Sequence, residues 1–359
     1  MTIAALHQRI SRSPAIGSLV FWCMASLPVM LLVLLFVALF TLSPALADTM
    51  TCAGKNVLDE MAKTDPAGLA RVRQEAAAIP NGKGILWRIE KDGVPASYLM
   101  GTMHLTDPRV LGMPKGAAAA FADARTVIIE SDEILDEKKA AVALLAKPEL
   151  TMFTDDTTIT KLLDSRENEK LERGLKSRGI SLALVQKMRP WIIASFVSLP
   201  ACEMARKAEG RSFLDKQLAL DAVAQGKQLK GLETMMEQLQ AMAELPIKLH
   251  LKALVETLEL GSRMEDIMTT MVDLYVSGDI GTIVPMLNAA TTRNGSPESD
   301  YAAFEQRIVI DRNHVMADRA APFLDKGSVF MAVGALHLPG KEGVIELLRG
   351  RGFRLTAIN

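Results

Sequence analysis

The chain carries strand-type sequence near both of its ends and helix-type sequence between them. β-branched or alternating apolar runs occur at Ile85–Ile89, Ser97–Met100, Thr126–Ile129, Ser328–Val333 and Phe353–Ile358. From about 134 to 325 the apolar residues follow the helical period, and only Gln228–Leu232 interrupts them. We therefore predict an α/β fold (α+β by residue count), with a central sheet built from N- and C-terminal segments and a large helical insertion.

The strand-type segments also predict how the sheet begins. Asp92-Gly93 between the first two runs indicates a hairpin. A helix-type segment, Lys115–Ala124, separates Ser97–Met100 from Thr126–Ile129. This order and length are typical of a βαβ crossover, so we predict that Thr126–Ile129 is a parallel neighbour of Ser97–Met100.

Helical periodicity predicts the remaining elements. A helix at Ala67–Ala78 precedes the sheet, and another at Lys341–Arg349 separates its last two strands. The helices expected in the insertion are Ile134–Ala146, Arg166–Arg178, Trp191–Lys207, Phe213–Ala224, Met235–Ala243, Ile247–Val276 and Tyr301–Leu324.

The N-terminus is typical of an export segment. No charged residue occurs between Arg12 and Asp48, and an apolar run ends in a small-residue pattern that closes at Ala47. Cleavage after Ala47 is the favoured interpretation. Ile16–Leu42 is also long enough for a bilayer, which takes roughly 20 residues, so a retained membrane anchor stays an alternative. Both place the rest of the chain outside the cytoplasm, in the periplasm or anchored facing it.

Three divisions of the chain follow: 1–47 as signal peptide or membrane anchor, 48–84 as an N-terminal arm and helix, and 85–359 as the main domain. Cleavage would remove Cys23 and leave Cys52 and Cys202 in an oxidising compartment, so we predict that these two form a disulfide. The formal net charge is −1 and aromatic residues make up 5%, which argues against a nucleic-acid partner.

One short motif occurs twice in the same context. Gly101–His104 and Gly334–His337 are both G-x-x-H segments, and each directly follows a strand-type run. Glycine permits a sharp exit from the strand, so each histidine is expected just beyond its carboxyl end. In open α/β sheets this edge is where ligands bind. A Cβ would push these turns away, so Gly101→Val and Gly334→Val are expected to damage activity more than stability.

Two further strand-type runs end in acids, at Glu130 and Glu233. If the four strands are parallel, His104, Glu130, Glu233 and His337 converge on one edge of the sheet. Two imidazoles and two carboxylates can bind a divalent metal ion, or hold and deprotonate a water molecule. Nucleophile and zincin sites are excluded, since the chain has neither G-x-S-x-G nor H-E-x-x-H.

In order and spacing, these motifs resemble the TraB/GumN family, to which the Tiki proteases are related. The resemblance covers about Ile85 to the C-terminus. It includes both G-x-x-H motifs, VIIESDE with Glu130, MRPWIIASFVSL, IDRNHVMADR with Arg312 and Asn313, and a stretch that places Asp215, Gly231, Glu233, Thr234 and Gln238 on family positions. It implies a fold similar to erythromycin esterase-like proteins and, for the Tiki branch, metal-dependent peptide hydrolysis.

We therefore expect an exported hydrolase that acts on a peptide or protein substrate. His104, Glu130 and His337 would bind a divalent metal ion, Glu233 would be a further ligand or base, and Arg312 would stabilise the developing oxyanion. Two alternatives stay open. One is a metal-independent hydrolase with a water activated by histidine and glutamate. The other is a non-catalytic protein that binds peptide or glycan. The sequence does not indicate the oligomeric state.

Overall fold

The computed structural model describes residues 52, 54–291 and 298–358. The proposed signal peptide or anchor at 1–47 lies outside these residues. Within the described part of the chain, no helix is both long and apolar enough to cross a lipid bilayer.

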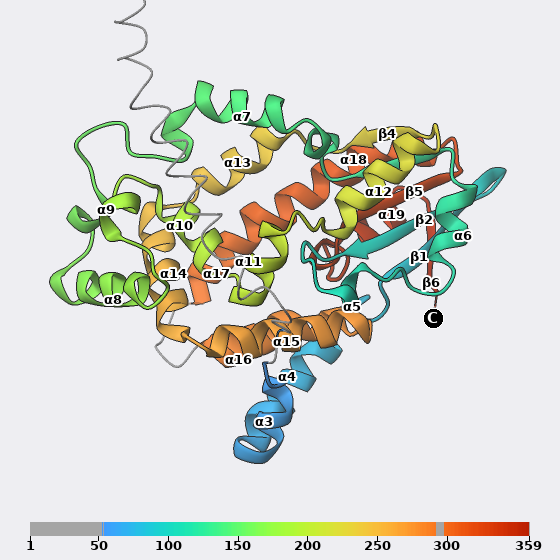
Figure 1. The fold of residues 1–359 in the computed structure, drawn as a ribbon. Coiled ribbons are helices and arrows are strands. Elements are labelled where there is room, and N and C mark those ends of the chain that lie inside the picture. The colour runs from blue at the N-terminus through green and yellow to red at the C-terminus, as the bar shows by residue number, and fades with distance from the viewer. Residues whose placement is uncertain (1–51, 53, 292–297, 359) are drawn as a thin grey trace, which may run out of the picture. The chain divides into compact units, whose positions relative to one another are not determined.

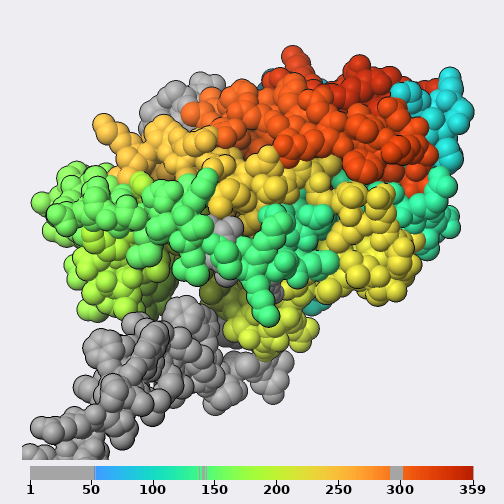
Figure 2. Space-filling model, turned by 90° about the horizontal axis from the view of Figure 1, so that it is seen from above, coloured from blue at the N-terminus to red at the C-terminus, as the bar shows by residue number. Residues whose placement is uncertain are grey.

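Six strands form one mixed sheet (Figure 1), in the order β4-β3-β5-β2-β1-β6. Their bounds are β1 Leu86–Lys91, β2 Val94–Thr102, β3 Thr126–Ile129, β4 Gln228–Gly231, β5 Val329–Gly334 and β6 Arg354–Ala357. β2, β5, β3 and β4 are parallel, whereas β1 pairs antiparallel with β2 and β6. In Figure 2 the red surface of the C-terminal segment adjoins the cyan surface of the hairpin.

The predicted fold class is confirmed, because β1–β3 come from the N-terminal part of the sheet-forming sequence and β5–β6 from the C-terminal part. One predicted neighbour was wrong. β3 does not pair with β2, because β5 lies between them and pairs with both. The completely buried run in β5 explains this order, since a parallel strand covered on both faces belongs at the centre of a sheet.

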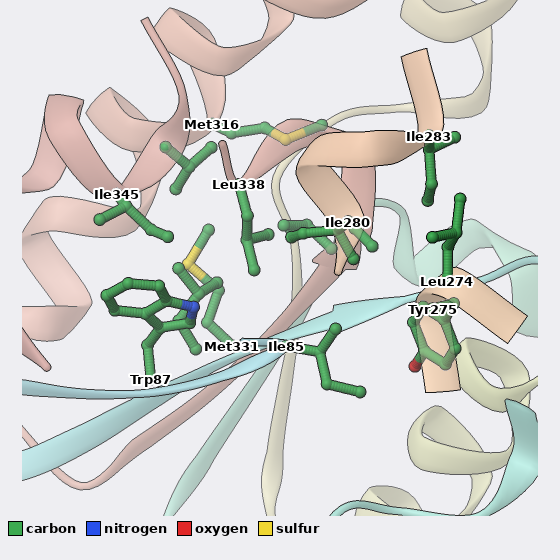
Figure 3. Close-up of a cluster of buried hydrophobic side chains, with 14 of the residues drawn as sticks. Ile85, Trp87, Leu274, Tyr275, Ile280, Ile283, Met316, Met331, Leu338 and Ile345 are labelled. Carbon is green, nitrogen blue, oxygen red and sulfur yellow. The ribbon is translucent and has the colours of Figure 1, made fainter. Parts of the chain in front are cut away.

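Side chains alternate between two apolar layers. Val329, Met331 and Val333 of β5 face one cluster of buried residues, and Phe330 and Ala332 face the other. Figure 3 shows part of the first cluster, in which Trp87, Tyr275 and Leu338 come from segments far apart in the sequence. The sheet is therefore packed with helices on both faces.

The N-terminal arm has two helices where one was predicted, and Pro108–Leu111 forms a short helix that was not predicted. The helices predicted at Lys115–Ala124 and Lys341–Arg349 are present with slightly different ends. The arm contains two helices, because Asn56 and Asp65 each cap a helix with their side chains. The bounds are α3 Val57–Thr64, α4 Pro66–Ala78, α5 Pro108–Leu111, α6 Ala117–Asp123 and α19 Val344–Gly350.

The insertion contains more and shorter helices than predicted. Pro200 and Gly261 divide two segments that were each expected to form one helix, because proline lacks an N–H and Gly261 has a positive φ of 53°. The bounds are α7 Glu137–Ala146, α8 Ser165–Lys176, α9 Leu182–Val185, α10 Pro190–Val197, α11 Ala201–Ala208, α12 Leu214–Ala224, α13 Met235–Ala243, α14 Ile247–Leu260, α15 Arg263–Val276, α16 Ile283–Thr291, α17 Glu298–Glu305 and α18 Asp311–Leu324.

The described chain also contains a disulfide and a π-helix. A disulfide joins Cys52 to Cys202, with their Cα atoms 5.4 Å apart, so the predicted pairing is confirmed. A π-helix at Gln306–Ile310 separates α17 from α18. Such segments are often found near functional sites.

Candidate active site

Four parallel strands end at the same edge of the sheet, and a polar residue follows each of them. His104 follows β2, His337 follows β5, Glu130 follows β3 and Glu233 follows β4. The two G-x-x-H turns leave the sheet at the same level, because Thr102 pairs with Gly334 in the parallel ladder.

Glu130 lies between the two histidines. Its Oε1 atom is 3.8 Å from Nε2 of His104 and 3.9 Å from Nε2 of His337. The structure thus brings together the three side chains that the sequence analysis selected as metal ligands.

Glu130 is buried and strongly held. The backbone N–H of Gly334 donates to its Oε1 at 2.7 Å, and Nη2 of Arg312 donates to its Oε2 at 2.8 Å. Burial acts to raise the pKa of Glu130, but His104, His337 and Arg312 outweigh this effect and hold the pKa well below its usual range. Glu130 is therefore an ionised acceptor at the centre of the site.

His337 is buried and neutral. Its Nδ1 lies 2.7 Å from Oδ1 of Asn313, whose Nδ2 in turn donates to the carbonyl of Glu342 at 2.8 Å. This second bond assigns Oδ1 of Asn313 as the acceptor, so Nδ1 of His337 carries the proton and Nε2 keeps its lone pair. Burial lowers the pKa of His337 to about 4, against the opposing effect of Glu130.

His104 is in a different environment. Its side chain is 50% exposed, and its ring stacks on Phe213 with the centroids 5.2 Å apart. Desolvation acts to lower the pKa of His104, but Glu130 and Asp215 outweigh it and raise the pKa to about 9. Without a bound metal ion, His104 is therefore a cation at neutral pH.

Arg312 connects Glu233 to the rest of the site. Its Nε and Nη2 atoms donate to Glu233 at distances of 2.7 to 3.1 Å. Its Nη1 atom lies 3.2 Å from the carbonyl of Ile308 and 3.4 Å from Nε2 of His337. Glu233 therefore reaches the histidines through the guanidinium rather than directly. The guanidinium N–H groups all face protein acceptors, so an oxyanion would have to displace one of them.

The sequence analysis did not select Asp215 as a candidate catalytic residue, although the stretch that resembles the family includes it. Its side chain is buried, Oδ1 lies 3.8 Å from Nε2 of His104, and Thr102 donates to the same oxygen at 2.7 Å. Oδ2 is buried without a hydrogen-bond partner in the described structure. Burial raises the pKa of Asp215 despite the opposing effect of His104. Helical spacing could have found it, because Asp215 lies on the same face of α12 as the buried Leu218 and Ala222.

The donor atoms suit a divalent ion in kind. Imidazole nitrogen and carboxylate oxygen are common ligands of zinc and related metals, and the buried Oδ2 of Asp215 is an acceptor that still needs a partner. A Cβ at Gly334 would lie 3.1 Å from Oε1 of Glu130, so glycine keeps this space free of a side chain. Among the described residues, however, no three or more such side chains are gathered as closely as a metal site requires.

The surroundings allow access from solvent. A cavity of about 180 Å³ adjoins Glu233 and Arg312 and is also lined by Arg307 and Glu237. The exposed side of His104 provides a second approach. The site thus lies at the surface, with the carboxylates of Glu130 and Glu233 buried and the side chain of His104 half exposed.

Comparisons with known proteins show what this chain is similar to. A profile of the TraB/PrgY/gumN family matches residues 85–357. The similar curated proteins include "Metalloprotease TIKI homolog" of Nematostella vectensis, which is 24% identical over 76% of this chain and 66% of its own length.

"Metalloprotease TIKI1" and "Metalloprotease TIKI2" of Danio rerio are each 26% identical over 75% of this chain, and over 62% and 60% of their own lengths. The chain thus matches roughly three-fifths to two-thirds of each of these relatives. No solved structure is significantly similar to it.

Proposed function

This chain belongs to the TraB/PrgY/gumN family, and from that premise we propose that it is an exported hydrolase that cleaves peptide bonds with the help of a divalent metal ion. The observation that carries the proposal is the position of Glu130 between two imidazoles at the carboxyl edge of a parallel sheet. The names of the curated relatives support the protease class.

His104, Glu130 and His337 are the proposed ligands, and Asp215 lies next to them, with its Oδ1 atom 3.8 Å from Nε2 of His104. A divalent ion held there would lower the pKa of a water molecule and polarise the substrate carbonyl. His337 is suited to this role, since Asn313 keeps its Nε2 atom unprotonated. His104 would have to lose a proton first, so metal binding would compete with protons.

Asp215 and Arg312 would transfer a proton and balance charge, respectively. Asp215 has a raised pKa and a free oxygen, so it is the best-placed group to accept a proton from the attacking water. Arg312 would hold Glu130 and Glu233 in place. The long contact from its Nη1 atom to His337 is the hydrogen bond that a substrate oxygen would most readily replace.

A metal-independent hydrolase is the second candidate. The observation that favours it is the pairing of a protonated His104 with Asp215, which has the form of an acid–base pair. In this mechanism His104 donates a proton to the leaving group while Asp215 accepts one from water.

One experiment tests these candidates together. The untagged full chain is purified, its metal content is measured, and cleavage of a peptide library is followed before and after treatment with a chelator. We expect about one divalent ion per chain and cleavage that the chelator abolishes and added metal restores. Glu130→Gln is the inactive control. Cleavage that persists without metal favours the second candidate. Peptide binding without any cleavage, retained in His104→Ala, contradicts both and favours a binding protein.

A further inference from the structure

The loop that follows His104 is held by a buried carboxylate from outside the sheet. The backbone N–H of Thr106 donates to Oε1 of Glu203 at 2.8 Å, and its hydroxyl donates to Oε2 at 3.0 Å. Thr106 is fully buried and Glu203 is 1% exposed. Glu203 therefore holds Thr106, two residues after His104, through two hydrogen bonds.

The charge of Glu203 is balanced inside the same cluster. Nη2 of Arg206 donates to Oε2 of Glu203 at 2.8 Å, and Nε of Arg206 donates to the hydroxyl of Thr106 at 3.1 Å. Each of the three side chains contacts the other two. A buried ionic cluster of this kind specifies one geometry, because removing any member leaves another without its partner.

Helix α11, which carries Glu203 and Arg206, is short and follows Pro200. The disulfide attaches it to the N-terminal arm at the residue directly before Glu203. Nη2 of Arg206 also lies 3.2 Å from Sγ of Cys52.

The arm is in turn bound to α15, where the N–H of Val57 donates to Oγ1 of Thr270 at 2.8 Å. Helix α15 touches the start of the same turn as well, because the hydroxyl of Tyr275 donates to the carbonyl of Gly101 at 2.9 Å. The turn that carries His104 is thus held by α11 on one side and by α15 on the other, and the disulfide joins α11 to the arm that is hydrogen-bonded to α15.

His104 needs such external support more than His337 does. The imidazole of His337 is fixed by its own hydrogen bond to Asn313. His104 is half exposed and lies on Phe213, so the position of its ring depends on where its loop is held.

We infer that Glu203 is a positioning residue for His104, and that the Cys52–Cys202 disulfide keeps Glu203 in place. The inference rests on the proposed function for its consequence in catalysis, but the geometry it claims can be measured without activity. Glu203 touches neither of the two imidazoles and acts through the loop.

The test compares Glu203→Ala, Glu203→Gln and Cys52→Ser/Cys202→Ser with the wild-type full chain. Glu209→Ala is the matched control, because Glu209 ends the same helix in an exposed pair with Arg211. Hydrogen exchange at the Thr106 amide and the imidazole NMR signals of His104 and His337 are measured first. Binding of Co²⁺ alone and peptide cleavage follow.

In Glu203→Ala we expect at least tenfold faster exchange at Thr106, a shifted or broadened His104 signal and an unchanged His337 signal. Co²⁺ binding and kcat are expected to fall about tenfold to a hundredfold, with KM little changed. Glu203→Gln should recover part of each loss, because it retains one acceptor for the Thr106 amide. The double cysteine variant should show the same changes in exchange, His104 signal, Co²⁺ binding and kcat, but smaller. If Glu203→Ala fails to fold, the double cysteine variant tests the inference in its place.

Unchanged exchange and an unchanged His104 signal in both Glu203→Ala and the cysteine variant would overturn the inference, whatever the activity. Equal changes at His104 and His337 would also overturn it, since they would indicate general loosening of the fold. If the wild-type chain neither binds metal nor cleaves peptides, the proposed function fails, while the exchange and NMR results still decide the positioning role.

Discussion

The two G-x-x-H turns have the same motif, follow parallel strands and contribute to one site, yet their histidines are held in opposite ways. His337 is enclosed, neutral and fixed through Nδ1 by Asn313. His104 is half exposed and positively charged in the absence of a metal ion. Its ring stacks on Phe213, and the loop that follows it is hydrogen-bonded to Glu203. A repeated motif thus fixes the backbone position of a side chain, whereas the neighbouring elements decide its charge.

The largest expected effect is the loss of either imidazole. His104→Ala and His337→Ala should each lower kcat/KM by about 10²–10⁴-fold. Their stabilities should differ, because His337→Ala leaves the buried Oδ1 of Asn313 without a donor, at a cost of about 1–3 kcal/mol. Peptide cleavage and urea unfolding measure the two effects. The exposed His314 provides the control variant His314→Ala. Full activity in either site variant would contradict the shared site.

The next largest effect is expected on stability, when the guanidinium of Arg312 beside His337 is removed. Arg312→Met leaves Glu130 and Glu233 buried without their partner, so we expect a loss of about 3–5 kcal/mol in the free energy of unfolding. Arg319 lies on the same helix as Arg312, and Arg319→Met removes its exposed ion pair with Glu237 and its hydrogen bond to the carbonyl of Leu232, which should cost about 1–2 kcal/mol. Arg312 also lowers the pKa of both His337 and His104, so its loss should raise the pKa of each histidine. Equal unfolding midpoints for the two variants would refute this account.

The two glycines should separate activity from stability. A Cβ at Gly334 would crowd Glu130 at 3.1 Å and lie 3.8 Å from Nε2 of His104, whereas one at Gly101 would meet the backbone of Ala335 at 3.0 Å. Gly334→Ala should therefore mainly reduce activity, and Gly101→Ala should mainly reduce stability, by about 1–3 kcal/mol. This refines the sequence-based expectation that both would mainly affect activity. Thermal unfolding and cleavage assays on the pair test it, and the reverse pattern would show that the contacts are misassigned.

The last expected effect is the pH dependence of the metal-free fold. The folded pKa of His104, about 9, is above the ordinary 6.5, so its stabilising effect is complete below pH 6.5 and is lost as pH rises through 9. The folded pKa of His337, about 4, is below 6.5, so its contribution is present above pH 6.5 and is lost as pH falls towards 4. NMR titration in the presence of a chelator measures both values, with His104→Gln and His337→Gln used for assignment. If both histidines titrated near pH 6.5, the proposed difference in charge between His104 and His337 would be wrong.

Much of this arrangement could be predicted from the sequence. The strand-type runs, the two glycines and the acid at Glu130 indicated a shared edge, because side chains that follow parallel strands meet there. The position of β5 between β2 and β3 could not be predicted, since a βαβ crossover fixes handedness and length but not which strand later enters the gap.

The protonation states and ion pairs of the site also could not be predicted from the sequence. Nothing adjacent to His337 in the chain indicates that Asn313 would select its tautomer, or that burial would lower its pKa. Arg312 was expected as an oxyanion donor, but its guanidinium donates to Glu130 and Glu233, which lie 182 and 79 residues away in the sequence. Such contacts depend on tertiary packing rather than on local pattern.

The central position of β5 has a consequence for the newly made chain. Until Val329–Gly334 inserts, β2 and β3 have no common neighbour, and neither His104 nor Glu130 has its partner from the second turn. The two halves of the site therefore come together only when β5 enters the sheet between β2 and β3. The proposed hydrolase would thereby stay inactive in any partly folded chain in which β5 has not yet paired with β2 and β3.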